Sequence, residues 1–485
     1  MDRVLKDLEP KLVLEYFEDL TRIPRGSGNE DQVCDYLIKF AEKNGFSWHK
    51  DDMKNLLIRV PATPGYEDHP TVIVQGHTDM VCEKNEDTIH DFEKDPIKME
   101  IEGDKIIAKE TTLGADDGIG IALAMAIASD KTIPHPPLEL VCTSDEERGM
   151  TGVEAFDTSL LKGRILINLD ATDEGVFVVG CAGGPVVRVE IPIEYEKAPQ
   201  DYAPIHIKIT GLKGGHSGED IHRGRANSIK LLSRIINDIG RNMPYKMAEI
   251  TGGLKYNAIP REAQAVLLVP NDSKEKAIDI AKKMAENFAR EYYSIENDLL
   301  VTAEEIDKTY ESVLTDTSVT KIMDFVTLAQ CGIVRMNPQL EGVVESSVSL
   351  GVINLEGDKA VIQTMTRSSS ESMYMDMYYN IERLAQNVGA KTFIMSNCPE
   401  WEYNPHSAIK NVFESTFEEI FNKKPKFLVL HAGLECGVFA KKIPEYVDMI
   451  AAGPDLRDLH TPGEYLIISS LQRFWEFFKE VFKKL

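Results

Sequence analysis

The sequence predicts an α/β protein, in which a mostly parallel, mixed sheet lies between layers of helices and an α+β domain is inserted. Three observations support this prediction. Up to Asp170, apolar runs typical of strands buried on both faces alternate with helical segments, as in a covered parallel sheet. After about Gly184 the pattern changes to the period-two alternation of antiparallel strands. From Trp401 the helix and strand pattern returns.

The first segment begins with apolar residues at three- and four-residue spacing across residues 10–45, interrupted by the polar stretch 24–30. This pattern predicts two amphipathic helices around a loop. A further helix is expected from Ile119 to Ser129. Because ligands of such sheets bind beyond the carboxyl ends of the strands, the residues that follow each strand are the first candidates for a site. The predicted buried strands are residues 55–60, 71–75, 138–142 and 165–170.

The middle of the chain has alternating runs at residues 205–218, 263–270 and 359–369, separated by helical runs at 226–239 and 274–292. This arrangement predicts an α+β insertion.

The last part shows a helix, a strand at residues 427–431, a short apolar segment at 446–452 and an amphipathic C-terminal helix. We therefore expect the last part to return to the first domain. The predicted domains are residues 1–185 (catalytic, first segment), 186–398 (inserted lid) and 399–485 (catalytic, second segment).

Composition excludes several classes of partner. The 485 residues include 54 basic and 79 acidic side chains, which leaves a formal charge of -25 and disfavours a nucleic-acid or anionic-membrane surface. The seven cysteines are scattered without a CxxC pair, which favours a reducing compartment. The N-terminal stretch lacks the apolar core of a signal peptide, and the run 118–128 is too short to span a bilayer. We expect a soluble cytoplasmic protein.

Four acidic or histidine-bearing motifs lie within the first domain, and three of them directly follow a predicted strand. A fifth candidate, His460, lies in DLHTPGE near the C-terminus. Imidazoles and carboxylates mixed in this way can hold two divalent cations about 3.5–4 Å apart. The motifs therefore predict a two-metal hydrolytic centre. They are GHTD (76–79), GADDG (114–118), SDEERG (144–149) and NLDATDEG (168–175).

Two of these motifs also have simpler interpretations. His77 at a strand end can bind a metal while Asp79 fixes its tautomer, but the pair could also be a surface histidine and a capping aspartate. Asp116 can bridge two cations, with Asp117 shaping the loop, but acids before an apolar helix are often caps.

Two acids adjacent in sequence usually form a solvated turn. Glu146 and Glu147, however, follow a predicted buried strand, where unpaired charge is costly. A division of roles resolves this cost: Glu147 binds a cation and Glu146 takes a proton from water. Asp170 would supply a terminal carboxylate to the other cation. The glycine-rich stretch 213–228 fits no nucleotide-binding motif, and HExxH is absent.

Taken in order, seven motifs resemble those of the aminoacyl-histidine dipeptidase family across essentially the whole chain. This family belongs to the dinuclear-zinc aminopeptidases and amidohydrolases, together with carnosinases, peptidase T and aminoacylase. The resemblance implies a zinc-exopeptidase-like catalytic domain with an inserted lid. The motifs are GHTDMV, GADDG, SDEERG, LDATDEG, GGHSGEDI, HAGLECG and DLHTPGE.

The resemblance also implies roles for individual residues. His77 and Asp170 would bind one metal, Glu147 and His460 the other, and Asp116 would bridge the two. Many relatives have lysine after the aspartate pair where this chain has Gly118, but that lysine is not a ligand. Outside the ligand set, Asp79 would orient His77, Glu146 would be the general base, His216 would polarise the scissile carbonyl, Arg367 would hold the substrate carboxylate and Glu435 would engage the free amine.

The implied function is metal-dependent hydrolysis of dipeptides, Xaa-His and a broader range, with two Zn²⁺ ions for which Co²⁺ or Mn²⁺ can substitute. An N-acyl amino acid deacylase of the same group is the nearest alternative, and a non-catalytic metal- or peptide-binding protein is a second one. A homodimer through the lid, with His216 acting in its own subunit or across the dimer, stays open.

Overall fold

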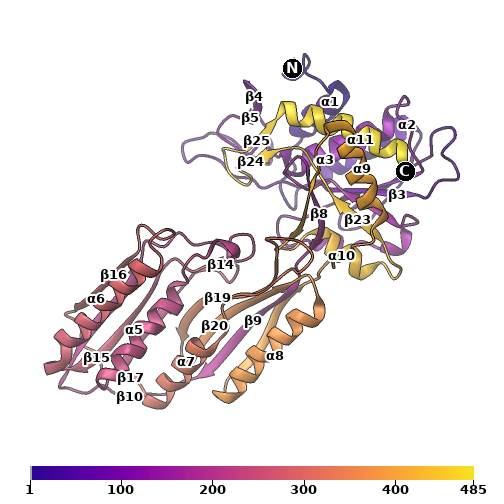
Figure 1. Cartoon of the computed structure of the whole chain (residues 1–485). Helices are drawn as coiled ribbons and strands as arrows, with labels where there is room; N and C mark the ends of the chain where they lie inside the picture. The colour runs from indigo at the N-terminus through magenta and orange to yellow at the C-terminus, as the bar shows by residue number, and fades with distance from the viewer. Residues whose placement is uncertain (1–2) are drawn as a thin grey trace. The chain divides into compact units, whose positions relative to one another are not determined.

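The computed structural model describes residues 3–485, so the first two residues of the predicted catalytic segment lie outside the described chain. The chain divides into two compact units. Unit 1 holds the chain up to Gly180 together with Trp401–Leu428 and Leu434–Leu485, and unit 2 holds Cys181–Glu400 and Val429–Gly433. Within unit 1, the yellow C-terminal elements lie among the indigo and purple elements of the first segment (Figure 1). The expected return of the chain's last part is therefore observed.

Unit 1 contains an eight-stranded mixed sheet, of which four neighbouring strands are mutually parallel: β6, β3, β7 and β23. The strand predicted at residues 55–60 is present but pairs antiparallel, because burial on both faces does not report direction. In spatial order the strands are β1 (Ser47–Lys50), β2 (Leu56–Val60), β6 (Leu138–Thr143), β3 (Val72–His77), β7 (Ile165–Asn168), β23 (Asp448–Ala451), β8 (Val176–Cys181) and β22 (Lys426–Leu430).

The helices of unit 1 confirm the two amphipathic helices predicted in residues 10–45. The helix α3 is buried along almost its whole length, which explains why its sequence is apolar on all sides. The backbone at its first acidic residues, Asp116 and Asp117, is not helical. The helices are α1 (Lys11–Thr21), α2 (Asp31–Asn44), α3 (Ala115–Ser129), α4 (Thr151–Ala155), α9 (Ala408–Phe421), α10 (Glu435–Lys442) and α11 (Ile468–Lys484).

A small four-stranded sheet in unit 1 joins the two segments of the chain. Its strands β5 and β25 pair antiparallel, so the segment just after His460 lies beside the segment that leads to Asp116. In spatial order the strands are β24 (Leu456–Arg457), β25 (Tyr465–Ile467), β5 (Lys105–Ala108) and β4 (Met99–Glu102).

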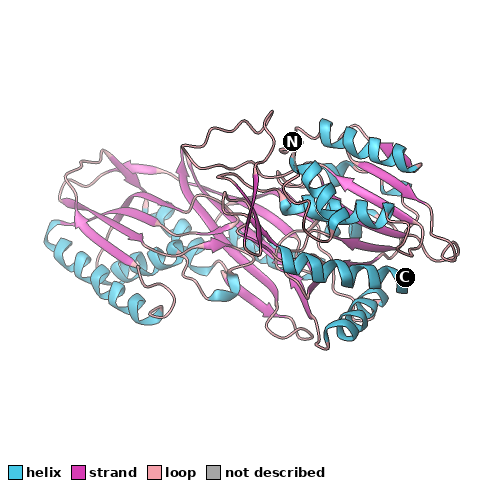
Figure 2. Cartoon of the chain, turned by 90° about the horizontal axis from the view of Figure 1, so that it is seen from above, coloured by secondary structure: helices cyan, strands magenta, loops and turns pink. Residues whose placement is uncertain are grey.

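Unit 2 confirms the predicted α+β insertion. It contains a nine-stranded antiparallel sheet with helices on one side of the strands (Figure 2). Inward-facing residues such as Ile205, Ile207 and Ile209 are fully buried in a single core with these helices. The helices are α5 (Ser228–Asn242), α6 (Lys274–Glu291), α7 (Asp316–Leu328) and α8 (Glu371–Asn387). No helix in residues 3–485 is long and apolar enough to cross a membrane.

One long strand of unit 2, β19, was not predicted. Its sequence has no clean alternation, because the buried residues Ser346, Ser347 and Ser349 interrupt the apolar pattern. In spatial order the strands are β16 (Leu300–Glu305), β11 (Tyr202–Thr210), β15 (Ala263–Pro270), β13 (Lys246–Gly252), β19 (Val344–Glu356), β20 (Lys359–Ser368), β9 (Gly184–Pro192) and β21 (Lys391–Cys398), with β18 (Gly332–Met336) beside β19. Two short pairs complete the unit: β10 (Tyr195–Lys197) with β17 (Ser312–Leu314), and β12 (Gly215–His216) with β14 (Ala258–Ile259).

Candidate metal centre

Three neighbouring parallel strands of unit 1 end at the same edge of the sheet. His77 is the last residue of β3, Glu146 follows the end of β6 by three residues, and Asp170 follows the end of β7 by two. Because β3 lies between β6 and β7, the side chains that follow these strands converge. The strand-end candidates of the sequence therefore lie in one place.

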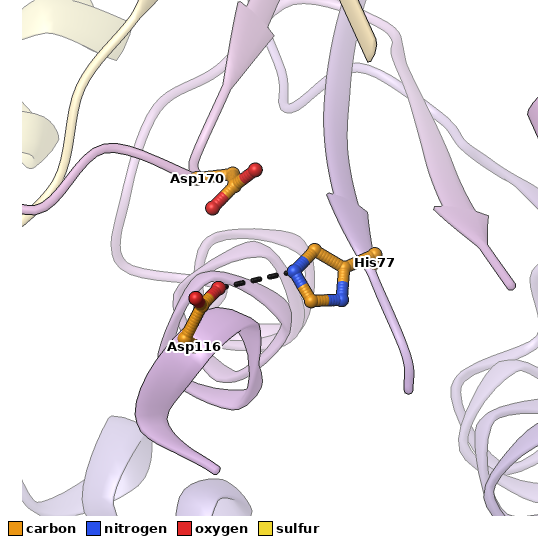
Figure 3. Close-up of side chains that lie close together, drawn as sticks. All are labelled: His77, Asp116 and Asp170. Carbon is orange, nitrogen blue, oxygen red and sulfur yellow. Dashed lines mark hydrogen bonds and ion pairs between the residues drawn. The ribbon is translucent and has the colours of Figure 1, made fainter. Parts of the chain in front are cut away.

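The carboxylate of Asp116 lies between two imidazoles. Its Oδ1 is 3.0 Å from His77 Nε2, and its Oδ2 is 3.3 Å from His460 Nε2. Figure 3 shows His77, Asp116 and Asp170 pointing toward one another, the first and last from strand ends and Asp116 from the start of α3. His460 also approaches Glu147, with 3.1 Å between Nε2 and Oε1. Each oxygen of Asp116 thus faces a different histidine.

Three overlapping groups of side chains could each hold a metal ion. In every group the candidate ligand atoms lie within 4.8 Å of one another. Asp116 belongs to two of the groups, so its carboxylate is shared between two potential ion positions. The groups are His77, Asp116 and Asp170; Asp116, Glu147 and His460; and His77, Glu146 and Glu147. All five predicted ligands, including the distant His460, lie together.

Asp79 is a fully buried carboxylate that connects His77 to the Glu146 segment. Its Oδ1 lies 3.4 Å from His77 Nδ1, and it accepts hydrogen bonds from the Ser27 hydroxyl (2.7 Å) and from the backbone N–H groups of Glu146 (3.1 Å) and Glu147 (3.3 Å). Burial by itself would raise the pKa of Asp79, but the hydrogen bonds from His77 and Ser27 outweigh burial and leave the pKa well below its usual range. Asp79 is therefore an anion that orients its neighbours.

Asp117 lies beneath the site and requires two glycines. Its Oδ2 accepts a hydrogen bond from the backbone N–H of His77 at 3.1 Å. A Cβ atom on Gly76 would lie 2.2 Å from Oδ2, and one on Gly120 would lie 2.1 Å from Oδ1. Gly76 of the first motif and Gly120 of α3 thus make room for this carboxylate, which holds the backbone of His77.

The carboxylates of the site carry more negative charge than the protein balances. Burial raises the pKa of Glu146 to about 8, and Glu435 and Glu147 add to the rise against the opposing effect of His77. Burial also raises the pKa of Asp170 well above its usual range, and the charge of Asp116 adds to this effect. Protons are therefore held by acids that would be ionised in water.

The excess of negative charge also raises the pKa values of the two imidazoles, His77 and His460. Burial lowers the pKa of His77, but hydrogen bonds to Asp116 and Asp79 outweigh it, and the net pKa lies well above its usual range. Hydrogen bonds to Asp116 and Glu147 raise the pKa of His460 to about 10. Both rings therefore favour the protonated, positively charged form, and they lie where cations would be held.

The donor set fits a pair of divalent cations. Two imidazole nitrogens with several carboxylate oxygens suit Zn²⁺, and ions such as Mn²⁺ and Co²⁺ accept the same ligands. Oε1 of Glu147 is buried and makes no hydrogen bond, although His460 Nε2 lies near it. Such an unsatisfied, buried oxygen is expected of a ligand atom.

Glu435, at the start of α10, lies behind the strand ends and has no exposed surface. Its Oε2 accepts hydrogen bonds from Gln75 Nε2 (2.5 Å) and from the Thr143 hydroxyl (2.8 Å), while Oε1 has no hydrogen-bond partner. Burial raises the pKa of Glu435 to about 7. Gln75 in turn accepts a hydrogen bond from Asn168, so this buried network connects the ends of β3, β6 and β7.

His216 and Arg367 both belong to unit 2, where they lie together. Arg367 is 4% exposed, and no carboxylate within residues 3–485 lies at ion-pair distance from its guanidinium. Its Nη2 is 3.4 Å from His216 Nε2, and its Nε has no hydrogen-bond partner. Burial lowers the pKa of Arg367 to about 10. A buried cation without an anion is thus present in unit 2.

A third residue of this cluster, His431, was not singled out by the sequence. Its Nε2 lies 2.7 Å from the Ser347 hydroxyl, and its buried Nδ1 has no hydrogen-bond partner. Burial, followed by the charges of Arg367 and His216, lowers the pKa of His431 to about 3. The cluster formed by His216, Arg367 and His431 is called the basic cluster below.

Several residues around the metal centre escaped prediction because no local signal marks them. Ser27 and Arg25 lie in the polar stretch 24–30, which the sequence shows only as a loop. Gln75 and Thr143 are polar residues inside apolar strands, and that interruption was the one available signal. Buried polar residues at the carboxyl end of a strand are costly unless they are paired, so their presence there indicates a nearby polar site.

Known proteins resemble the chain over nearly its whole length. The family model described as Peptidase family M20/M25/M40 matches residues 73–484. The cytosol non-specific dipeptidase of Escherichia coli is 35% identical over 99% of both chains. The crystal structure of aminoacylhistidine dipeptidase from Vibrio alginolyticus matches with a TM-score of 0.92 and 35% identity, covering 99% of this chain and 98% of that one.

A more distant structure shows the same fold. The aminopeptidase PepT from Bacillus cereus matches with a TM-score of 0.55 and 16% identity, covering 98% of this chain and 99% of that chain.

Proposed function

The chain belongs to peptidase family M20/M25/M40, and from that premise we propose that it is a metal-dependent dipeptidase that hydrolyses Xaa-His and a broader range of dipeptides. One observation carries the metal-dependent part: the Asp116 carboxylate lies between His77 and His460, with further acids from adjacent strand ends around it. The substrate class rests on two relatives named as dipeptidases.

In the proposed site, His77 and Asp170 would hold one cation, Glu147 and His460 would hold the other, and Asp116 would serve both positions. When bound, a pair of divalent cations supplies Lewis acidity, which makes water more acidic and polarises a carbonyl group. Zn²⁺ is the expected ion, and Co²⁺ or Mn²⁺ can replace it because ligand type only partly selects the metal.

Glu146 is proposed as the general base. Its pKa, raised by burial to about 8, suits a carboxylate that takes a proton from water and returns it to the leaving amine near neutral pH. Asp79 positions this base, because its carboxylate accepts the backbone N–H of Glu146 and also faces His77. The same buried anion thus orients a ligand and the base.

The basic cluster is proposed to act on the substrate. His216 is proposed to polarise the scissile carbonyl, and the hydrogen bond that its Nδ1 accepts from the backbone N–H of Glu219 orients the ring. Arg367, buried without an anionic partner, suits the carboxylate of a dipeptide. Glu435 is proposed to engage the free amine, and its unsatisfied Oε1 supports this role.

One experiment separates the dipeptidase from the N-acyl amino acid deacylase. Purified protein is assayed for metal content and, in the same sample, for hydrolysis of Ala-His and of N-acetyl-His. We expect about two divalent ions per chain and turnover of Ala-His. Rapid cleavage of N-acetyl-His alone would overturn the proposal in favour of the deacylase.

The proposal also includes a location and an assembly. A cytoplasmic location is supported by the relative named as a cytosol dipeptidase, and the net charge of -25 supports small peptides rather than nucleic acid as partners. A homodimer through unit 2 stays a prediction, and sedimentation of the purified protein is the measurement that checks it.

A further inference from the structure

Glu464 ends the DLHTPGE motif that carries His460, and no step of the proposed reaction uses it. Its side chain is 2% exposed, and its carboxylate accepts hydrogen bonds from four consecutive backbone N–H groups where the loop meets the start of α3. These donors are Leu113 (2.8 Å) and Gly114 (2.9 Å) to Oε2, and Ala115 (2.7 Å) and Asp116 (3.3 Å) to Oε1. The last donor is the proposed bridging residue itself.

Arg25 binds the same loop at the carbonyl group of Gly114 and joins it to the segment after His77. The guanidinium is 1% exposed, and its Nη2 donates a hydrogen bond to the carbonyl oxygen of Gly114. Its Nη1 donates to the carbonyl oxygens of Thr78 (2.9 Å) and Asp79 (3.0 Å), which follow His77. A buried carboxylate therefore binds the N–H groups of the loop while a buried guanidinium binds its carbonyl group.

The loop can accept these partners only because it contains glycine. Gly114 has a φ of +70°, a left-handed conformation that other residues rarely adopt. A Cβ atom on Gly114 would lie 2.7 Å from Arg25 Nη2, and one on Gly118 would lie 2.5 Å from the same nitrogen. The two glycines of the GADDG motif thus make room for the guanidinium of Arg25.

Glu464 also anchors the turn that presents His460. This turn contains two residues with positive φ, Asp458 (53°) and His460 (59°), which cost energy outside glycine. The backbone N–H of Glu464 donates to the carbonyl oxygen of Thr461 at 3.1 Å, and β25 begins at the next residue. One side chain therefore lies at the junction of the strained turn and a paired strand.

We propose that Glu464 is a positioning residue that couples Asp116 to His460 and so assembles both ion positions before the ions bind. The inference rests on the proposed two-metal site. Its physical basis is charge-assisted hydrogen bonding: a buried carboxylate with four N–H donors fixes the loop in one conformation. Groups that orient metal ligands typically change metal affinity 10- to 100-fold when removed.

The test compares Glu464→Gln with Glu139→Gln. Glutamine keeps the size of the side chain but places an amide N–H₂ against two backbone donors. Glu139 is a matched control in unit 1, because it is 2% exposed and accepts backbone N–H groups from Lys162 and Gly163 away from the metal ligands. Metal affinity is measured by titration with Zn²⁺, and ligand geometry by the visible absorption of the Co²⁺-loaded protein.

We expect Glu464→Gln to weaken Zn²⁺ binding about 10- to 100-fold and to change the Co²⁺ spectrum, with KM little changed at saturating metal. Glu139→Gln should lower thermal stability and leave both metal measurements unchanged. Glu464→Asp keeps both oxygens on a shorter side chain, so its affinity should be intermediate. This variant provides the test if the glutamine variant does not fold.

Two results would overturn the inference. Zn²⁺ affinity and Co²⁺ spectrum equal to wild type in the Glu464 variants would show that the ligands are positioned without this carboxylate. Equal weakening by Glu139→Gln would show a general loss of stability instead. Wild-type protein that binds no pair of ions would overturn the proposed function as well, which distinguishes that failure from a failure of Glu464 alone.

Discussion

The metal centre of unit 1 and the basic cluster of unit 2 are charged in opposite senses. In unit 1, buried acids crowd two histidines, and burial raises the pKa of Glu146 and Asp170. In unit 2, burial lowers the pKa of Arg367 and His431, and no acid pairs with the guanidinium. Each unit thus holds buried charge that its own residues do not neutralise, which is costly in the absence of a ligand. The charges of unit 1 therefore suit cations, and those of unit 2 suit an anion.

The two sites also arise from different kinds of secondary structure. The metal ligands follow the ends of parallel strands, where a sheet edge gathers side chains from several segments. Arg367 lies within antiparallel β20, directly opposite Ser347 of β19, whose hydroxyl contacts His431. The edge of the parallel sheet gathers candidate ligands from several strands, whereas β20 presents one guanidinium, one residue before the strand ends.

Removing cations should have the largest effect, because the carboxylates around Asp116 outnumber the two imidazoles that face it. We expect a chelator to abolish dipeptide hydrolysis and added Zn²⁺ to restore it. The chelator should also lower the thermal midpoint of unfolding, because a ligand that binds only the folded state stabilises that state. Metal analysis and turnover on the same sample are the measurements. Undiminished turnover by protein with less than about one ion per chain would contradict the two-metal site.

Glu146→Gln should separate the base from the ligands around it. We expect kcat to fall by about 10²- to 10⁴-fold, the usual contribution of a general base, while metal content stays near that of wild type. Glu147→Gln is the matched control and should lose metal. Unchanged turnover in Glu146→Gln would refute the role of this residue, and lost activity with full metal content would exclude the non-catalytic binding protein.

Arg367→Met should test whether the basic cluster of unit 2 recognises the carboxylate of the substrate. Hydrogen bonds to a charged group contribute about 1.5–3 kcal/mol, so kcat/KM for Ala-His should fall roughly 10- to 100-fold. The amide of Ala-His, which lacks the carboxylate, should be hydrolysed equally by variant and wild type. Metal content is expected to be unchanged. An equal loss on both substrates would show that Arg367 does not recognise the carboxylate.

His431→Gln should change the pH dependence of the free energy of unfolding, and this is the smallest of the expected effects. The pKa of His431 is lowered to about 3 in the folded protein, so between that value and about 6.5 the unfolded chain binds one more proton. Stability from this residue therefore falls as pH falls. Between pH 7 and pH 5 wild type should lose about 2 kcal/mol relative to His431→Gln in urea unfolding.

Exposed His49 offers the control for this measurement. His49→Gln should follow the wild-type pH dependence. If His431→Gln is as acid-sensitive as wild type, the buried neutral imidazole is not a source of that sensitivity.

The sequence predicted the local features well because they have short-range causes. Apolar runs followed by His77, Glu146 and Asp170 predict strand ends, and a sheet edge brings such ends together whatever the details of packing. The α+β insertion was likewise visible in its alternation. β19 was missed because its buried serines break the pattern, and His431, the partner of Ser347, lies 84 residues away.

Side-chain chemistry and hydrophobic periodicity are local properties, so the kinds of ligand and the strands that present them could be predicted from the amino-acid order alone. Only the tertiary structure decided that His460 meets Asp116 across 344 residues, and that Glu464 and Arg25 hold the loop between them. These contacts depend on how distant segments pack, which no local pattern encodes. The same holds for Arg367: no acid in residues 3–485 pairs with it, and this depends on the residues packed around it rather than on its own sequence.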